Sequence, residues 1–343
     1  MGEYRGVLRQ AGLYSSRRVR AALGAVLALL IVFPHFSSSY ILSLGTEVLI
    51  FGLFALSLDI LLGFTGLVSL GHALFYGLGG YTLGLAANHL DLTNSLVLIP
   101  AVMAGAVVVA MSVGFLSLRT VGIYFLMLTL AFAQMAYALV EQFHNFTGGD
   151  DGLARITRPE FALGGLSFRI GGGMEFYYYV LAVCVILFYV VLRVIHSPFG
   201  HALVGIRENE NRMRALGYDV FRYKLAAFAF SGVLGALAGM LHSEFNIFVS
   251  PEAFYWTTSG TVLIMVIIGG TGTLIGPVMG AGLVLLMRNL LSSYTEREAM
   301  ITGIVFILFV LFLRGGLMDV PAVVRTQLTK IRSRARSGKA GVS

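Results

Sequence analysis

Apolar stretches long enough to cross a lipid bilayer recur along almost the entire sequence. Hydrophobic residues make up 57% of the 343 residues and charged residues only 12%, about half the charged share of an average soluble domain. A helix needs about 20 apolar residues to span the hydrocarbon layer, where the backbone must satisfy its own hydrogen bonds. The sequence therefore predicts an all-α, polytopic membrane protein.

We expect about ten transmembrane helices, each close to the length that a bilayer requires. The expected spans are residues 21–36, 42–62, 68–88, 95–118, 120–142, 176–194, 225–246, 254–268, 274–291 and 299–313. Glycine and proline interrupt the second, third, eighth and ninth spans. We expect some of these to be broken or re-entrant helices, whose freed backbone groups bond to neighbours or water.

The distribution of Lys and Arg predicts the orientation, because basic loops are retained on the cytoplasmic side. If the chain has ten spans, both termini are cytoplasmic. The cytoplasmic termini are then the basic N-terminal segment, residues 1–20, and the basic tail, residues 315–343. We expect the tail to be disordered or adsorbed on lipid. They flank a transmembrane domain, residues 21–314, with a long external loop at 143–175 and a cytoplasmic loop at 195–224. The basic residues left outside number five of 24: Arg155, Arg158, Arg169, Arg288 and Arg297.

The cytoplasmic loop contains a charged segment with helix signals, residues 197–224, which we call the polar insert. Ser197 can cap a helix that has Pro198 in its first position, and Gly217 suits the left-handed residue that ends one. Glu208 with Arg212, and Glu210 with Arg214, stand four residues apart in the favourable order. The pattern predicts a short amphipathic helix on which a soluble partner can push.

Two glycine-interrupted turns, GFTG at 63–66 and GGTG at 269–272, stand in separate halves of the chain. Paired helix breaks of this kind form transport sites in some carriers, which is one interpretation of these turns. The alternative interpretation is that the small residues only allow neighbouring helices to pack closely. Asp59 and His72 flank the first turn and could meet across it. Ionisable side chains inside a membrane suggest a transport pathway or a buried pair. The alternative is that the side chains of Asp59 and His72 are hydrated at the membrane surface. The pathway candidates are Asp59, Gly63, Thr65, Gly66, Ser69, His72, Tyr76, Gly269, Gly270, Thr271 and Gly272.

Four charged residues in the external loop are candidates for docking or gating. Asp150 and Asp151, flanked by glycines, suggest a turn or a weak cation site, although the regular acidic spacing of a calcium loop is missing. Arg155 and Arg158 could pair with carboxylates of an external partner; the alternative is a solvated face.

Several function classes find no support in the sequence. A GxxxxGK[ST] phosphate loop, an HExxH helix, a GxSxG elbow and a Cys/His cluster are all missing, and Cys184 is the single cysteine. We therefore expect no enzyme activity, no metal and no cofactor in this chain. The net charge of +7 does not indicate nucleic acid, because the basic residues flank apolar spans. Energy must then come from an ion gradient or from another polypeptide.

Five strings, in order and correctly spaced, resemble the M-type permease subunit of ATP-binding-cassette (ABC) importers for branched-chain amino acids. They are GFTGLVSLGHALFYGLGGY, RTVGIYFLMLTLAF, TGGDDGL, the segment from Ser197 to Gly239, and GGTGTLIGPVMGA. The resemblance implies a type II ABC-importer-like permease in a bacterial or archaeal plasma membrane. It also implies a second permease subunit, two cytoplasmic ATPases that carry ATP and Mg, and an external solute-binding protein.

By this resemblance residues 207–217 of the polar insert form the coupling helix that sits in a cleft of the ATPase. The coupling residues it implies are Arg207, Glu208, Asn209, Glu210, Arg212, Ala215, Leu216 and Gly217. Related importers carry urea, short amides or aromatic acids, so these substrates remain alternatives. Two rival functions are a gradient-driven carrier that uses Asp59, His72 or Glu244, and a membrane scaffold that transports nothing.

Overall fold

The computed structural model describes residues 17–163 and 166–292, together with 300–301, 303–304, 306–307 and 316–317. Most of the N-terminal segment, most of the tenth expected span and most of the basic tail therefore lie outside the described residues. The long helices are α2 (Arg17–Phe36), α3 (Ser39–Asp59), α4 (His72–His89), α5 (Ser95–Ser117), α6 (Ile123–Gln142), α8 (Met174–Ile195), α11 (Val220–Asn246), α12 (Trp256–Gly269) and α13 (Gly276–Ser292).

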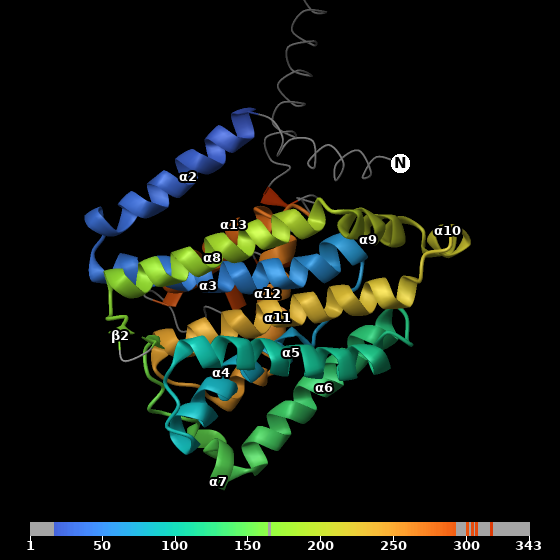
Figure 1. Ribbon diagram of the computed structural model, residues 1–343. Coiled ribbons are helices and arrows are strands. Elements are labelled where there is room, and N and C mark those ends of the chain that lie inside the picture. Colours follow the sequence, from blue (N-terminus) through green and yellow to red (C-terminus); the bar gives the residue numbers. More distant parts are fainter. Residues whose placement is uncertain are drawn as a thin grey trace, which may run out of the picture.

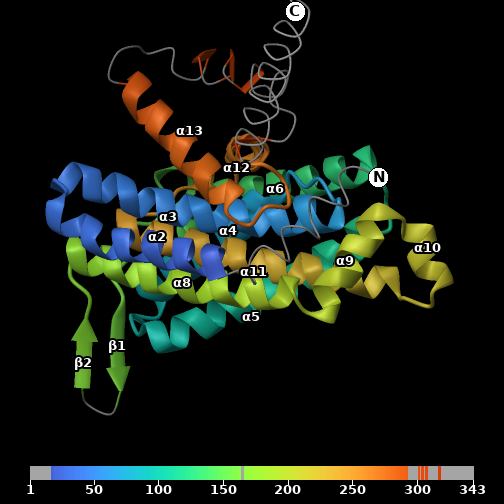
Figure 2. The same cartoon turned by 90° about the horizontal axis from the view of Figure 1, so that it is seen from above.

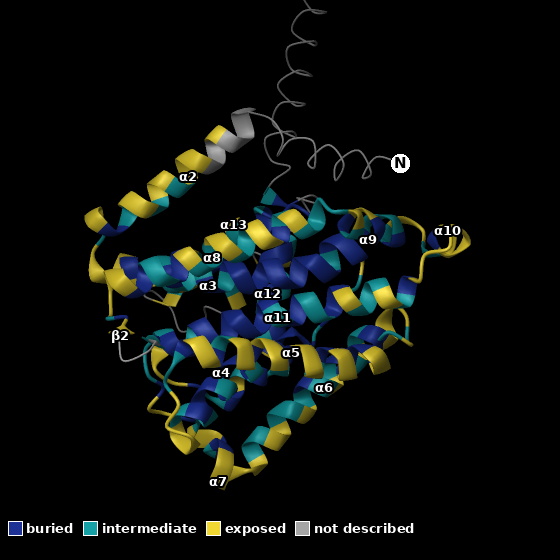
Figure 3. Ribbon diagram, viewed as in Figure 1, coloured by how far each residue is buried: buried dark blue, intermediate teal, exposed yellow. Residues whose placement is uncertain are grey.

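Helices α3 and α11 form the centre of the bundle (Figure 1). α11 packs against α3, α4 and α5, and α3 also packs against α8, α12 and α13. α3 and the turn after it form one span, and 78% of the residues in its most apolar stretch are buried. In the most apolar stretch of α11, 72% of the residues are buried. The corresponding values for α5, α6 and α8 are only 28%, 17% and 22%. Figure 3 accordingly colours much of these three helices as exposed or intermediate.

Within the described residues, five helices are long and apolar enough to cross a membrane: Ser39–Thr65, Ser95–Ser117, Ile123–Gln142, Met174–Ile195 and Val220–Asn246. Three shorter apolar helices, Gly24–Phe36, Trp256–Gly269 and Gly276–Ser292, accompany them. The helical, polytopic membrane architecture is thus confirmed, whereas the number of ten spans and the side of each terminus stay predictions.

Several helix starts differ from the expected spans by a few residues, and two of these differences have a clear local cause. The third span was expected from residue 68, but α4 begins at His72, because the chain after the first glycine turn runs without helix until Gly71. The seventh was expected from residue 225, but α11 begins at Val220, where the Asp219 carboxylate accepts a hydrogen bond from the Arg222 N–H and caps the helix. A capping Asp compensates the unpaired N–H groups of a first turn.

The expected external loop is folded rather than extended. It contains α7 (His144–Thr147), the 3-10 turn η2 (Gly149–Asp151) and an antiparallel hairpin of β1 (Glu160–Leu163) and β2 (Leu166–Arg169), in which Glu160 pairs with Arg169. The hairpin projects from the bundle in Figure 2. A second 3-10 turn, η3 (Pro251–Phe254), joins α11 to α12.

Candidate functional site

The polar insert folds into two helices, α9 (Pro198–Glu208) and α10 (Glu210–Ala215), where a single helix was expected. Asn209 separates them: its backbone is extended, and its side-chain oxygen accepts a hydrogen bond of 2.9 Å from the Arg212 N–H. Asn is among the strongest N-cap residues, and this signal in the sequence was overlooked.

The helix break decides which of the expected ion pairs forms. Glu210 and Arg214 are joined at 2.6 Å, as expected. Glu208 and Arg212 lie on opposite sides of the break, and no ion pair joins them in the part of the chain that the structure describes.

Of the two helix-end residues expected in the polar insert, Gly217 and Ser197, one has the expected role and the other does not. Gly217 adopts the expected left-handed backbone, with φ of +88°. Ser197 precedes Pro198 as expected, but its hydroxyl donates to the Val194 carbonyl instead of capping the new helix.

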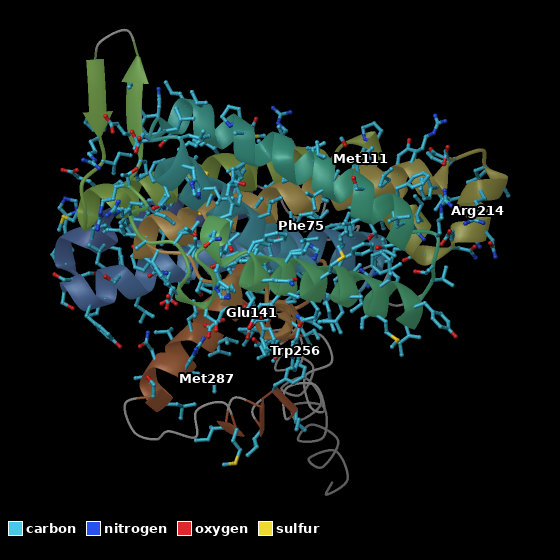
Figure 4. The ribbon with its side chains drawn as sticks, turned by 90° about the horizontal axis from the view of Figure 1, so that it is seen from below. Phe75, Met111, Glu141, Arg214, Trp256 and Met287 are labelled. Carbon is cyan, nitrogen blue, oxygen red and sulfur yellow. The ribbon has the colours of Figure 1, made fainter. Side chains whose placement is uncertain are left out.

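Helix α10 is fixed to the bundle on one side and exposed on the other. Met213 is buried with Ala202, Ile206 and Val220, and Glu210 also pairs with Lys224 of α11 at 2.6 Å. The exposed face of α9 and α10 carries most of the implied coupling residues, namely Glu208, Asn209, Arg212, Ala215, Leu216 and Gly217. Figure 4 places Arg214 at the opposite end of the molecule from the β hairpin. This geometry suits a contact with a second protein.

Partial burial of the Glu210 carboxyl raises its pKa, but the hydrogen bonds and charges of Lys224 and Arg214 outweigh this and hold the pKa below its ordinary value. The carboxylate is therefore stabilised in its charged form by both partners.

A second set of contacts joins the polar insert to both glycine turns; we call it the junction. The guanidinium of Arg207 on α9 donates a hydrogen bond to the Gly63 carbonyl. The carboxylate of Asp59, at the end of α3, accepts one of 2.7 Å from the N–H of Gly272 in the second turn. The two turns, 209 residues apart in sequence at Gly63 and Gly272, are thus in direct contact beside Arg207.

Glycine is required in the junction by close approach and by backbone conformation. A Cβ atom on Gly63 would overlap the Asp59 carboxylate and the backbone of Gly272. Gly272 has a φ of +75°, which side chains disfavour. The end of α3 continues into a π-helical turn, η1 (Ile60–Thr65), a distortion that is frequent at functional sites. The break expected after the second span is present here.

The remaining candidates in the two turns have structural partners. Thr65 donates from its hydroxyl to the Leu61 carbonyl at 2.6 Å, and the Ser69 hydroxyl accepts from the Gly71 N–H. A Cβ on Gly269 would overlap the Gly276 carbonyl. Gly66 has a φ of +72° beside the Arg207 side chain, Gly270 has a φ of +110°, and Thr271 is exposed. These residues shape the turns.

Asp59 and His72 are both fully buried, so the expectation of hydrated side chains is wrong. They do not bond to each other either. The His72 ring Nε2 lies 2.7 Å from the Ser231 hydroxyl, which in turn donates to the Ser57 carbonyl. His72 therefore connects α4 to α11 and α3, while Asp59 belongs to the junction.

Tyr76 lies deeper in the bundle, one turn into α4. Its ring stacks on Phe54 with centroids 4.4 Å apart. Two glutamates differ in their burial: Glu244, named above for the gradient-driven carrier, is buried, while Glu47 is half-buried.

The external candidates divide into two groups. Asp150, Asp151 and Arg155 are exposed and available to a partner. Arg158 donates to the Gly171 carbonyl at 3.1 Å and lies 5.7 Å from the centre of the Phe176 ring, so it stabilises the loop itself. Among the described residues, no group of three or more His, Cys, Asp or Glu is placed to hold a metal ion.

Comparisons with known proteins identify the family of this chain. Residues 40–313 match the family described as the permease component of the branched-chain amino acid transport system. The high-affinity branched-chain amino acid transport system permease protein LivM of Escherichia coli strain K12 is 29% identical over 95% of this chain and 80% of its own length. The protein of that name from Salmonella typhimurium is 30% identical over the same shares.

An archaeal relative is more distant. The probable branched-chain amino acid transport permease protein LivM of Methanocaldococcus jannaschii is 27% identical over 75% of this chain and 83% of its own length. No solved structure matches the chain significantly.

Proposed function

Since this chain belongs to the family of permease components of branched-chain amino acid transport systems, we propose that it forms the membrane pathway of an ATP-driven ABC importer. Its substrates are branched-chain or related hydrophobic amino acids, delivered by a solute-binding protein outside the cell. The protein works in the plasma membrane beside a second permease subunit. ATP and Mg bind to two separate cytoplasmic ATPase subunits, because this chain has no phosphate loop.

The observation that carries this proposal is the exposed polar insert and its contact with the membrane core through Arg207. An ATPase that binds α10 and moves on closing would displace α9, and Arg207 would carry this displacement to Gly63 at the end of α3. A ligand-driven rigid-body shift of packed helices is a standard way to switch a transporter between two states. In this orientation the external loop, with Asp150, Asp151 and Arg155, faces the binding protein.

The contacts of the ionisable residues favour this proposal over a gradient-driven carrier. Asp59 accepts from Gly272 and lies near the Arg207 charge, and His72 is held by Ser231. Both side chains thus hold helices and turns in place, a structural role that fits an importer driven by separate ATPases.

Leu216 offers the direct test, because it is 67% exposed on the proposed ATPase face. Leu216→Asp should abolish co-purification with the ATPase subunits, since a carboxylate is disfavoured in an apolar contact. Leu90→Asp is the matched control: Leu90 is 65% exposed at the far end of α4. Equal ATPase capture by the two variants would contradict the proposal.

The substrate class needs its own experiment. Purified solute-binding protein should bind leucine, isoleucine and valine, and vesicles that contain the full complex should import them only with ATP. Binding of urea, amides or aromatic acids alone would favour the other importer classes, and uptake by this chain alone under an ion gradient would favour the carrier.

A further inference from the structure

The last turn of α4 is bound to the external loop through two neighbouring side chains, Asn88 and His89. We call these two residues the loop anchor, and we call residues 144–154, which include α7 and η2, the η2 segment. The Asn88 amide donates to the Ala154 carbonyl at 2.8 Å and also to the Gly84 carbonyl of its own helix at 2.9 Å. Asn88 therefore joins the end of α4 to the far end of the η2 segment.

His89 joins the same helix to the near end of the η2 segment. Its ring Nε2 lies 2.9 Å from the Phe146 carbonyl, and because a carbonyl oxygen can only accept, Nε2 is the donor. The His89 ring also stacks on the Phe146 ring, with centroids 4.8 Å apart and planes 13° from parallel. The exposed Asp150 and Asp151 lie between the two contacts of the loop anchor, so α4 is attached on both sides of them.

The η2 segment has a third attachment, which keeps it folded independently of the loop anchor. Leu153 and Val249 form two backbone hydrogen bonds, of 2.8 Å and 3.1 Å. Val249 lies beyond the end of α11, which terminates at the left-handed residue Ile247. The Leu153 side chain is buried against Gly84 of α4, but an apolar contact has no direction. The hydrogen bonds of the loop anchor are the directional contacts between the η2 segment and α4.

Helices α4 and α11 are in backbone contact in the middle of the bundle. A Cβ atom on Gly79 would overlap the Ala236 carbonyl, and one on Gly239 would overlap the Tyr76 carbonyl. Backbones this close leave no layer of side chains between the helices, and tightly packed interiors transmit displacements. We therefore expect α4 and α11 to move as one unit.

Both helices also extend to the end of the molecule that carries the polar insert. α11 begins at Val220, directly after the polar insert, and its Lys224 pairs with Glu210 of α10 at 2.6 Å. α4 begins at His72, whose ring lies 2.7 Å from the Ser231 hydroxyl of α11. A continuous series of contacts thus runs from α10 through α11 and α4 to the loop anchor.

The alternative is that the loop anchor only stabilises the external loop. Hydrogen bonds from side chains to backbone carbonyls are a common way of holding a loop on a helix. Contacts by themselves do not distinguish the two roles, because a path of contacts is not yet an energetic coupling. A coupling free energy between the two faces of the protein does distinguish them.

We propose that Asn88 and His89 are positioning residues, which transmit docking of the solute-binding protein on the η2 segment to α4, and through α4 and α11 to the polar insert. The inference rests on the proposed function and deepens it, because it names the residues through which docking outside and nucleotide binding inside influence each other. Such an influence is reciprocal: nucleotide changes the affinity for the binding protein by the same factor as docking changes the affinity for nucleotide.

The test measures the dissociation constant of the leucine-loaded binding protein for the full complex in lipid nanodiscs, with and without the non-hydrolysable ATP analogue AMP-PNP. In the wild type, we expect the two constants to differ by about fivefold or more. In Asn88→Ala/His89→Ala, this difference should fall below about twofold, because two hydrogen bonds to α4 are lost. The constant without nucleotide should stay close to that of the wild type, since Asp150 and Asp151 are unchanged.

Two further variants guard against a loss of folding. Asn88→Ala alone should lose part of the difference between the two constants, and it is compatible with the fold because Ala favours a helix more than Asn does. Asn145→Ala is the matched control: Asn145 is exposed on α7, in the same η2 segment, and the variant should keep the wild-type difference.

The outcomes separate this inference from the proposed function. A double variant that keeps the wild-type difference, or in which both constants rise by the same factor, would show that the loop anchor is only structural and would overturn the inference. Equal constants in a wild-type complex that imports leucine would overturn it as well. A wild-type complex without ATP-dependent leucine uptake would instead overturn the proposed function.

Discussion

The two ends of α3 carry polar side chains of similar chemistry in opposite arrangements. At one end, Asp59 binds the backbone of Gly272, and Arg207 binds the backbone of Gly63. At the other, Glu47 is half-buried, and the buried Tyr76 hydroxyl has no hydrogen-bond partner in the described structure. Polar groups that bind backbone partners fix the positions of helices and turns, whereas a buried hydroxyl without a partner fixes nothing.

Removal of the carboxylate at each end tests this difference most strongly. Asp59→Ala should destabilise the purified protein by about 3 kcal/mol, because it leaves the buried Gly272 N–H and the Arg207 charge without their anion. Glu47→Ala should change the free energy of unfolding by no more than about 1 kcal/mol. Denaturation in detergent measures both, and equal losses would show that the two ends are not built differently.

Gly63 sharpens the comparison at the junction. Gly63→Ala should cost about 1 to 3 kcal/mol, because the added methyl group overlaps Asp59 and Gly272. Gly105→Ala, in α5, is the control: a Cβ there meets no atom within 4 Å, and Ala favours a helix over Gly by up to about 1 kcal/mol. If both variants had the same thermal midpoint, the close approach of the two turns would be wrong.

Glu210 gives the smallest expected effect and one that depends on pH. Because its pKa is lower in the folded protein than the ordinary value of 4.5, its pairs stabilise the fold above that value and lose this effect as the pH falls through the folded pKa. Glu210→Gln should therefore cost about 1 kcal/mol at pH 7 and nothing once wild-type Glu210 is protonated. A pH series of unfolding curves measures this, with Glu208→Gln as the control; a pH-independent loss would contradict the assignment.

Periodicity and composition predicted the helical membrane fold well, because bilayer-spanning segments must be apolar and long. The helix starts at His72 and Val220 were missed, since local signals such as the Asp219 cap were overlooked. The break at Asn209 was missed for the same reason.

The sequence predicted the residues of the site but not the contacts between them. Gly63, Gly272, Asp59 and Arg207 were all candidates, yet nothing in the sequence shows that two turns 209 residues apart touch, because this depends on how α3, α12 and α13 pack. The burial of Glu244 was not predicted either, since the position of a residue along a helix does not determine its burial inside a bundle.

The most direct test of the account is the number of leucine molecules imported per ATP hydrolysed, measured in the same vesicles for wild type and Arg207→Ala. If Arg207 links the polar insert to the membrane core, the variant should still assemble and hydrolyse ATP, while its uptake falls at least tenfold. An unchanged ratio of leucine to ATP in a fully assembled Arg207→Ala complex would contradict that link.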